Sequence, residues 1–352
     1  MTTVPCGTAA LITAITNANA HRGGVLNLAR SCTYALTAVD NQDANGSSNG
    51  LPQITSPITV NGNNATISRA DDVADPFRFF DVPSTAGRLV LHRLTMSGGI
   101  DDTQQPGGGP GNAVLVHDGG RLLTNATTFT ANGVPQVGSG RGAVGSDGGN
   151  VTLVDSTFEH NFGLIGAGVY NTNGTMRLVR TRFLDNAAPS VIGNGGAVAN
   201  DDNGTLVMVA STLSGNRAGI FGGGVWNTGS MSVLASRITG GDVGYPGSPF
   251  VVPGEGGGIA NFGTMTVTAT RIVANHSSLD IGTAQGTAAG IKNFRDAVIT
   301  LVNSPVTDNI AVAAPGGIDN DNGTVRLRHS PVTRNEPTNC TGSISPVPGC
   351  VG

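Results

Sequence analysis

Two short motifs recur along the chain at intervals of 25 to 34 residues. In the first, small residues precede an apolar residue, a variable residue and Asn, as in GGAVAN (195–200) and GGGVWN (222–227). In the second, an apolar residue stands three positions before Asn, as in FEHN (158–161) and FLDN (183–186). Because the same pattern returns at each interval, every unit needs the same neighbours, which is typical of a stacked repeat architecture.

Each unit has the periodicity of β-strands. Apolar residues stand seven and five positions before the central apolar residue of the second motif, as Val151 and Leu153 do before Phe158. A spacing of two is the strand period, and Gly, Asn and Asp turns separate these segments, with no stretch long enough for a crossover helix. The sequence therefore predicts an all-β, single-domain right-handed parallel β-helix (a solenoid) of roughly ten coils.

The repeated asparagines are predicted to be structural. Equivalent residues in a parallel stack lie about 4.8 Å apart, so aligned amides can hydrogen-bond from coil to coil and close the turns. The aligned residues are Asn171, Asn200, Asn227, Asn261, Asn293 and Asn320. A second column of Ser and Thr, which includes Ser156, Thr181 and Ser211, is expected to act in the same way.

The two ends of the stack are expected to be capped, because an open β-helix end is an unpaired edge. Residues 8–20, TAALITAITNANA, predict a short amphipathic helix with Leu11, Ile12 and Ile15 on its apolar side. The four cysteines fall in two terminal pairs, for which the expected disulfides are Cys6–Cys32 and Cys340–Cys350. The predicted organisation is a cap over 1–40, a β-helix over 41–335 and a C-terminal tail over 336–352.

Composition restricts the class of partner and the compartment. Charged residues make up 12% of the chain and the net charge is −4, which argues against a general nucleic-acid binder. No stretch approaches the roughly 20 apolar residues of a membrane span. A single Lys and two disulfides suit a secreted, extracellular protein, and we interpret Met1 as a start that follows removal of a signal peptide.

The pairing of GGAVAN (195–200) with FLDN (183–186) and FEHN (158–161) resembles the repeat of the polymorphic outer-membrane proteins, which belong to the pectin-lyase-like β-helix superfamily. The resemblance covers about residues 85 to 335. It implies the β-helix scaffold. Relatives with this repeat on cell surfaces are adhesins, and other β-helix relatives are polysaccharide lyases and glycoside hydrolases. Because the repeat supplies only the scaffold, it assigns no catalytic residue here.

Coil length varies at one corner of the predicted helix. The extra residues follow the second motif and precede the next glycine motif, at 97–112, 133–142, 240–258 and 276–290. Insertions in a solenoid map to one face, which is often the binding face. In the 240–258 loop we select Asp242 and Glu255 as candidate catalytic carboxylates and Tyr245 as a substrate contact; the alternative is that these are ordinary solvated loop residues. Trp226, in the variable slot of the first motif, is a candidate for stacking on a sugar because that slot need not be buried.

A row of arginines is expected on the outside of the stack. Arg182, Arg237 and Arg271 precede the central apolar residue and should therefore point outward. Arg237 and Arg271 fall on adjacent coils, where like charges are unfavourable without intervening anions. Those anions are either Asp242 or Glu255, or carboxylates and sulfates of a bound substrate.

Two weaker candidates complete the set. Glu159 is expected to point outward near Arg182, and His160 and Asp185 occupy equivalent positions on neighbouring coils, where they could form a carboxylate-oriented base. A surface hydrogen bond is the alternative. The segments DDNG (201–204) and DNDNG (319–323) offer oxygens to Ca²⁺, but they lack the spacing of a known calcium loop, so turns are the preferred interpretation and no cofactor is assigned.

Two functions remain open. The first is a secreted enzyme, a polysaccharide lyase or glycoside hydrolase that acts on an extended polysaccharide in a groove beside the loop face. Elimination on a uronate needs a base and a cation, and hydrolysis needs two carboxylates across the bond. The second is a non-catalytic extracellular binding or adhesin-like scaffold, which the low aromatic content of 4% favours. The oligomeric state stays open.

Overall fold

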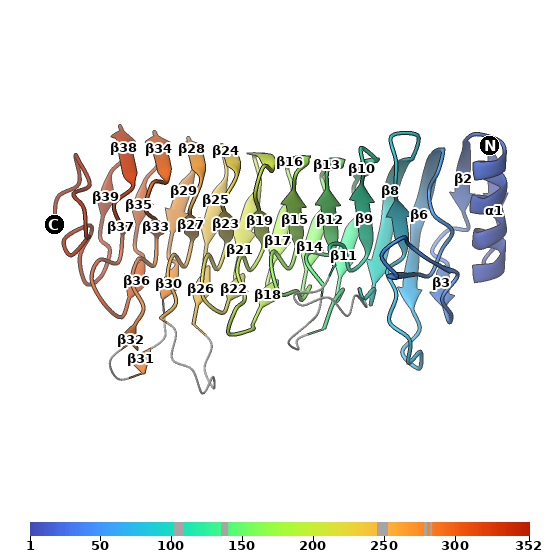
Figure 1. The fold of residues 1–352 in the computed structure, drawn as a ribbon, viewed down its shortest axis with the longest axis horizontal. Coiled ribbons are helices and arrows are strands. Elements are labelled where there is room, and N and C mark those ends of the chain that lie inside the picture. The colour runs from blue at the N-terminus through green and yellow to red at the C-terminus, as the bar shows by residue number, and fades with distance from the viewer. Residues whose placement is uncertain (102–108, 135–139, 245–252, 278–279, 282–283) are drawn as a thin grey trace.

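The computed structural model describes residues 1–101, 109–134, 140–244, 253–277, 280–281 and 284–352, the side chains of 280, 281, 284 and 285 excepted. It is an all-β parallel β-helix of about 9 turns, with 47% strand and 4% helix. The coils stack along one axis, with the two termini at opposite ends (Figure 1). The expected fold class is confirmed.

Three parallel sheets form the walls of the β-helix. The main sheet has 21 strands, and most coils contribute one longer and one shorter strand to it. Its strands are β1 (Thr2–Val4), β2 (Gly24–Leu28), β3 (Thr33–Leu36), β6 (Pro57–Arg69), β8 (Arg88–Ser97), β10 (Arg121–Asn125), β11 (Thr128–Thr130), β13 (Asn150–Val154), β14 (Thr157–Glu159), β16 (Thr175–Val179), β17 (Arg182–Leu184), β20 (Thr205–Val209), β21 (Thr212–Ser214), β24 (Ser230–Leu234), β25 (Arg237–Thr239), β28 (Thr264–Thr268), β29 (Arg271–Val273), β34 (Val298–Val302), β35 (Val306–Thr307), β38 (Thr324–Arg328) and β39 (Val332–Thr333).

The other two parallel sheets are smaller. The nine-stranded sheet consists of β7 (Phe80–Val82), β9 (Val114–His117), β12 (Val144–Asp147), β15 (Val169–Thr172), β19 (Val198–Asn200), β23 (Val225–Asn227), β27 (Ile259–Asn261), β33 (Ile291–Asn293) and β37 (Ile318–Asn320). The five-stranded sheet consists of β18 (Ala187–Ala188), β22 (Arg217–Ala218), β26 (Asp242–Val243), β30 (His276–Ser277) and β36 (Ile310–Ala311). Two antiparallel pairs, β4 (Asn41–Gln42) with β5 (Ser48–Asn49) and β31 (Asp280–Ile281) with β32 (Ala284–Gln285), lie outside the walls.

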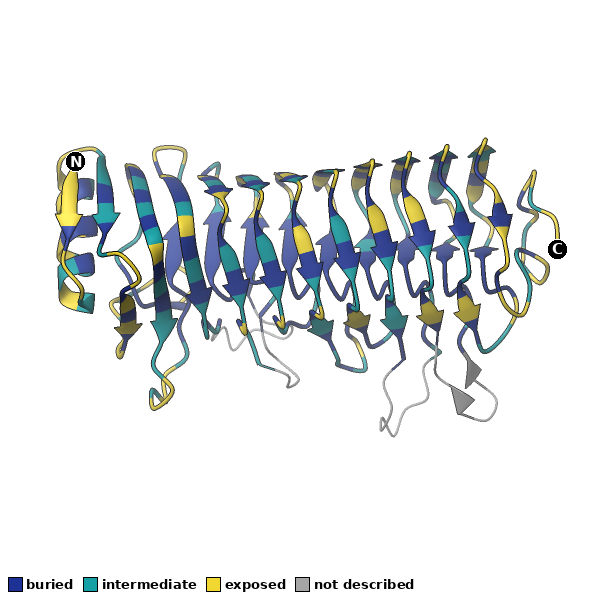
Figure 2. Cartoon of the chain, turned by 180° about the vertical axis from the view of Figure 1, so that it is seen from behind, coloured by how far each residue is buried: buried dark blue, intermediate teal, exposed yellow. Residues whose placement is uncertain are grey.

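The interior is one continuous apolar column, because the register places equivalent side chains above one another. Phe129, Phe158 and Phe183 are register partners on successive coils. Their rings stack with centroids 4.6 and 5.0 Å apart, and all three are fully buried. Along the main-sheet strands, buried and more exposed residues alternate (Figure 2), as a strand with one buried face requires.

The predicted asparagine ladder is confirmed. From Asn171 to Asn293, each side-chain Nδ2 donates to Oδ1 of the Asn on the next coil at 2.8 to 3.0 Å, ending at Asn320. The asparagines of the second motif form another buried ladder, in which Asn161 donates to Asn186 and Asn186 to Asn216, each at 2.9 Å. These amides satisfy buried polar groups at the turns, where unpaired groups are costly.

The glycine motif is explained by the backbone at its corner. Gly222 and Gly256 lie in the left-handed region, with φ of 67° and 73°, where a side chain is strained. A Cβ at Gly222 would also collide with the carbonyl oxygen of Val225. The motif therefore marks a tight corner that leads into each strand of the nine-stranded sheet.

Both ends are capped. Helix α1 (Thr8–Ala20) covers the first coil and buries Leu11, Ala14, Ile15 and Ala18, whereas Ile12 is half-buried. The expected disulfides Cys6–Cys32 and Cys340–Cys350 are both present. Strands β1 to β3, within the predicted cap segment 1–40, pair into the main sheet.

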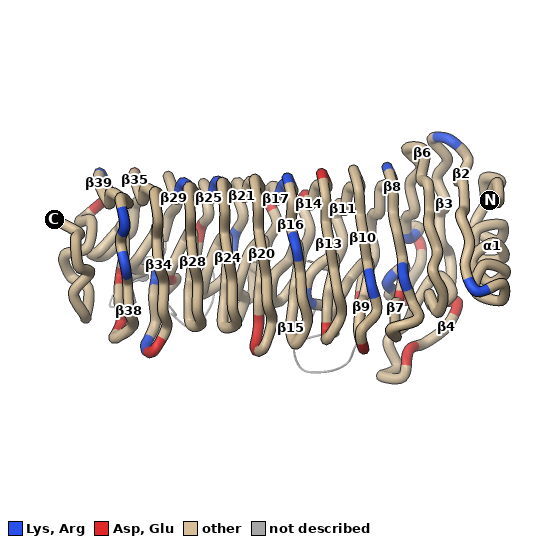
Figure 3. Tube along the Cα trace, turned by 90° about the horizontal axis from the view of Figure 1, so that it is seen from above, with Lys and Arg blue, Asp and Glu red and all other residues tan. Residues whose placement is uncertain are grey.

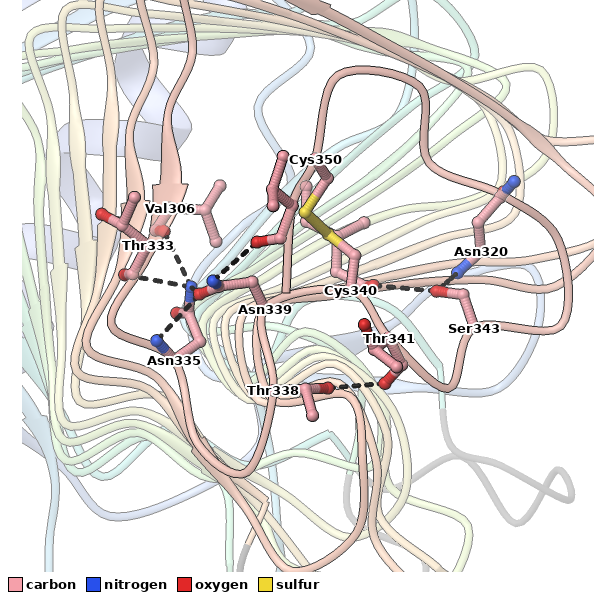
Figure 4. The surroundings of a disulfide bond; sticks show 12 residues. Val306, Asn320, Thr333, Asn335, Thr338, Asn339, Cys340, Thr341, Ser343 and Cys350 are labelled. Atoms are coloured by element: carbon pink, nitrogen blue, oxygen red, sulfur yellow. Dashed lines mark hydrogen bonds between the residues drawn. A yellow bond between two sulfur atoms is a disulfide. The ribbon is translucent and has the colours of Figure 1, made fainter.

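The C-terminal segment extends the ladder beyond the last coil (Figure 4). Nδ2 of Asn335 donates to Oδ1 of Asn339 at 3.0 Å, and Asn339 in turn donates to the carbonyl of Val351 at 3.0 Å. The Cys340–Cys350 disulfide closes the loop that begins directly after Asn339. This arrangement satisfies the amides of a ladder that otherwise ends at an edge.

Candidate functional site

The outer face of the nine-stranded sheet carries a group of aromatic side chains and a largely buried ionic cluster. Its middle outward position is the slot of Trp226, and the register places Tyr170, Ala199, Trp226, Ala260, Lys292 and Asp319 in one column. We expected this slot to tolerate exposure. Trp226 is half-buried, but Tyr170, Lys292 and Asp319 are each at most 4% exposed.

Trp226 and three phenylalanines form an aromatic patch on this face. Phe262 and Phe294 stack with centroids 3.7 Å apart, and Phe221 packs edge-on against both at 5.3 and 5.2 Å. The Trp226 ring lies 6.4 Å from Phe262 at an angle of 64°. All four side chains are partly exposed, although the chain has only 15 aromatic residues. Such a patch on the outside of a polar solenoid is typical of an interaction site.

An ionic cluster adjoins the aromatic patch. Nζ of Lys292 lies 3.0 Å from Oε1 of Glu255 and 2.7 Å from Oδ2 of Asp319. The hydroxyl of Thr287 lies 3.3 and 3.2 Å from these two oxygens, and since it has one hydrogen it donates to one of them at a time. The ammonium also lies 5.4 Å above the ring of Phe294. The charged cluster and the aromatic patch are therefore one continuous surface.

The cluster carries more negative charge than its lysine neutralises. Two carboxylates face one ammonium, and Oδ1 of Asp319 is buried without a hydrogen-bond partner among the described residues. Burial acts to lower the pKa of Lys292, but attraction to Glu255 and the hydrogen bond and charge of Asp319 outweigh it, so the pKa is raised. Lys292 therefore stays protonated. The Glu255 side chain is 20% exposed and that of Asp319 is 5% exposed, so Glu255 is the carboxylate that a ligand can reach.

Of the sequence-predicted candidates, Glu255 and Trp226 are brought to this face. Phe221 and Glu255 pair at the corner that precedes it, and Trp226 lies on β23. Asp242 lies on β26 in the five-stranded sheet, where Oδ2 is 3.5 Å from Nε of Arg217. Tyr245 lies outside the described residues.

The remaining candidates lie on other surfaces. Arg182, Arg237 and Arg271 project from the main sheet and are exposed, as expected. Glu159 also belongs to the main sheet, and the described residues contain no ion pair between it and Arg182. His160 and Asp185 are exposed at equivalent positions on neighbouring coils, but no hydrogen bond joins their side chains in the described part of the chain.

Several of the oxygens considered for Ca²⁺ are bound by protein donors, whereas Oδ1 of Asp319 has no donor among the described residues. Asp201 accepts hydrogen bonds from the Tyr170 hydroxyl at 2.7 Å and from the Thr228 hydroxyl at 3.0 Å, and Asp319 binds Lys292. Over the ranges that the structure describes, no group of three or more His, Cys, Asp or Glu residues is arranged to hold a metal. These segments act as turns and as anchors for outward side chains.

A histidine that the sequence did not indicate lies on the same sheet nearer the N-terminus. Nε2 of His117 is 2.9 Å from Oδ1 of the buried Asp81, and Nδ1 is 2.8 Å from Oδ2 of the exposed Asp118. Gln53 donates to the other oxygen of Asp81 at 2.6 Å. Burial acts to lower the pKa of His117, but the hydrogen bond and charge of Asp81, with those of Asp118, raise it overall.

The sequence contained a partial signal for the site formed by the Trp226 aromatic patch and the Glu255 cluster. Glu255 stands out in the sequence because Glu is scarce and this one lies in an insertion, whereas Lys292 and Asp319 occupy a position that varies from coil to coil. The contacts of Lys292 with Glu255 and Asp319 depend on the register of three successive coils.

The chain matches no family model, no curated protein and no solved structure. Among the described residues, no helix has the length and hydropathy needed to span a membrane.

Proposed function

We propose that this protein is a secreted carbohydrate-binding β-helix, and that an extended polysaccharide lies across the outer face of the nine-stranded sheet. The observation that carries the proposal is the continuity of the Trp226 aromatic patch with the cluster of Glu255, Lys292 and Asp319. Aromatic surface beside a few fixed polar groups is the usual composition of a small-molecule or sugar subsite.

The chemistry suits a sugar chain. The C–H face of a sugar ring packs against an aromatic ring, and its hydroxyl groups hydrogen-bond well to charged side chains. Trp226 offers the apolar surface, and the partly exposed Glu255 offers an acceptor whose position Lys292 fixes. Because the coils repeat along the axis, the face extends in the direction of a linear polymer.

The geometry supports binding better than hydrolysis. A glycoside hydrolase places two carboxyl groups on either side of the scissile bond. Here the oxygens of Glu255 and Asp319 are both held by the one ammonium of Lys292, and Asp319 is almost completely buried, so no sugar fits between them. The predicted catalytic residues Asp242, His160, Asp185 and Glu159 belong to other surfaces.

A polysaccharide lyase or hydrolase is the second candidate. The partial exposure of Glu255 beside a fixed cation favours it, since elimination needs a base and a neutralising cation. The two disulfides fit a non-cytoplasmic protein. Secretion is a part of the proposal that rests on the two disulfides and the single Lys. Membership of the polymorphic outer-membrane protein-type repeat group in the pectin-lyase-like superfamily is a part of the proposal that rests on the repeated motifs.

A panel of neutral and acidic polysaccharides tests the proposal. Purified protein is titrated with each polymer by calorimetry, and new reducing ends and ultraviolet absorbance are followed in parallel. We expect at least one polymer to bind, with a large loss of affinity in Trp226→Ala and little change in Phe162→Ala, a half-buried aromatic outside the face. Release of reducing ends that Glu255→Gln abolishes would establish the enzyme instead. If folded protein neither binds nor cleaves any polymer of the panel, both the binding and the enzymatic proposals are refuted.

A further inference from the structure

Positive charge is segregated onto the outer face of the main sheet. Its 21 strands contain ten Arg and one acidic residue, Glu159, although the chain as a whole has a net charge of −4. The arginines are Arg69, Arg88, Arg93, Arg121, Arg177, Arg182, Arg237, Arg271, Arg326 and Arg328. Figure 3 looks onto this face and shows blue segments within the strands and most of the red at the turns. The asymmetry belongs to this one face.

Three of these arginines form a stripe, which we define as Arg182, Arg237 and Arg271. They share one outward column of the shorter main-sheet strands. Arg237 and Arg271 are direct register partners, and Arg182 is two coils, about 10 Å, from Arg237. All three are exposed, and no ion pair to any of them is found among the described residues.

The protein's own anions do not neutralise this stripe. Asp242 and Glu255, the first of the two alternatives for this role, pair with Arg217 and Lys292 instead. Like charges directly opposite one another in a sheet are destabilising. Nothing in the described fold compensates the Arg237–Arg271 pair, and an external anion between the two guanidinium groups would do so.

A groove at the N-terminal end of the stripe provides space for such an anion. It has a volume of about 550 Å³ and is lined by Asp155, Ser156, Thr157, Arg180, Thr181, Arg182, Ala210 and Thr212. The groove is open because the small residues Ala210 and Thr212 follow Arg180 and Arg182 in their columns. Asp155 holds Arg180 through two hydrogen bonds of 2.6 and 2.8 Å, which leaves Arg182 as the guanidinium without a protein partner in the described groove.

We propose that the stripe and this groove form a second binding surface, for a linear anionic polysaccharide that carries sulfate or carboxylate groups and runs along the β-helix axis. Arg presents paired N–H groups that match the oxygens of sulfate and carboxylate. The surface is independent of the proposed site around Trp226, which lies on a different sheet and takes sugars through aromatic contacts.

The composition of the face favours a glycan over other polyanions. Proteins that bind single-stranded nucleic acid combine positive charge with exposed aromatic platforms, and the aromatic residues of the main-sheet strands, Tyr34, Phe129, Phe158 and Phe183, are all buried. A membrane surface would be expected to take exposed apolar anchors, and Leu234 is the one large exposed apolar residue described in these strands.

The test measures the affinity of the full chain for heparin, a uronate polymer and a neutral polymer over a range of salt concentrations. In the variant R182T/R237T/R271T we expect the Kd for the anionic polymers to rise about tenfold or more, with a weaker dependence on salt. Thr occupies this column at Thr157 and Thr212, so the variant should fold, which circular dichroism checks. The control R121T/R326T/R328T removes the same charge from the same sheet outside the stripe and should retain most of the affinity.

Each outcome decides the proposal. Equal losses in the two triple variants would show attraction to net charge alone and would overturn the stripe, as would unchanged binding in R182T/R237T/R271T. Tighter binding to single-stranded DNA or to vesicles of anionic lipid than to both anionic glycans would overturn the choice of ligand. Trp226→Ala should retain heparin binding, so failure of the proposed function leaves this measurement interpretable.

Discussion

Replacing Lys292 by Met should destabilise the coils around the candidate site strongly. The lysine is the single cation within reach of Glu255 and Asp319 in the described structure, and its side chain is 5% exposed. Met keeps the length and apolar stem of the side chain, so the substitution removes the charge with little loss of packing. Two carboxylates then face one another with little water.

The expected cost is about 3–5 kcal/mol, the range for removing one partner of a buried ion pair. Both carboxylates lose their countercharge, and Thr287 can donate to one of them at a time. In the triple variant K292M/E255Q/D319N no charge is left in the cluster, so most of the loss in unfolding free energy should disappear.

The fluorescence of Trp226 allows unfolding to be followed in the coils around the cluster. Trp226 is the only tryptophan of the chain and lies on the same sheet as the cluster, so its fluorescence during urea denaturation reports these coils, while circular dichroism reports the whole β-helix. We expect K292M to unfold at a lower urea concentration than the wild type by the fluorescence signal at pH 7. Equal midpoints for K292M and the wild type at pH 7, or a deficit that persists undiminished in the triple variant, would refute the electrostatic reasoning.

Three further predictions concern other parts of the β-helix. Asn227→Ala should cost about 1–3 kcal/mol of unfolding free energy, because Asn200 loses its acceptor and Asn261 its donor in a buried ladder; an unchanged urea midpoint would show that the ladder is dispensable. The pKa of His117 is raised above 6.5, so its stabilisation is fully present below pH 6.5 and is lost as the pH rises through the raised pKa; H117Q should remove this slope from a plot of melting temperature against pH, and a slope retained in H117Q would assign it elsewhere. Arg271→Thr should raise the unfolding free energy by about 0.2–1 kcal/mol, because it removes a like-charge pair, and a measurable loss of stability would contradict that account.

The fold was predictable because it repeats. The apolar pair at a spacing of two and the central apolar residue recur along the repeats, and the asparagine recurs in most of them, so a departure in one coil does not obscure the pattern. The asparagine ladder from Asn171 to Asn320 followed from that periodicity and was confirmed. The capping helix followed from the amphipathic pattern of residues 8–20 and was also confirmed. The second ladder, through Asn161 and Asn186, was visible as a motif, but its hydrogen bonds depend on the buried corner that the structure shows.

The site was predictable only in part, because it is made by residues that break the repeat. Trp226 and Glu255 stand out in the sequence as rare residues, and both lie on the candidate face. Lys292 and Asp319 occupy a variable slot, and the contacts of Lys292 with Glu255 and Asp319 depend on the register of three successive coils. Asp242 was one candidate counterion for Arg237, but in the five-stranded sheet it lies beside Arg217 instead.

Acrylamide quenching of Trp226 fluorescence, with and without a saturating concentration of the polysaccharide that binds, tests the central claim most directly. The half-buried ring is the single emitter of its kind in the chain and lies within the proposed binding face. If the polymer lies across the nine-stranded sheet, quenching should fall when it is bound. Unchanged quenching at saturation would place the polysaccharide elsewhere and would contradict the proposed function.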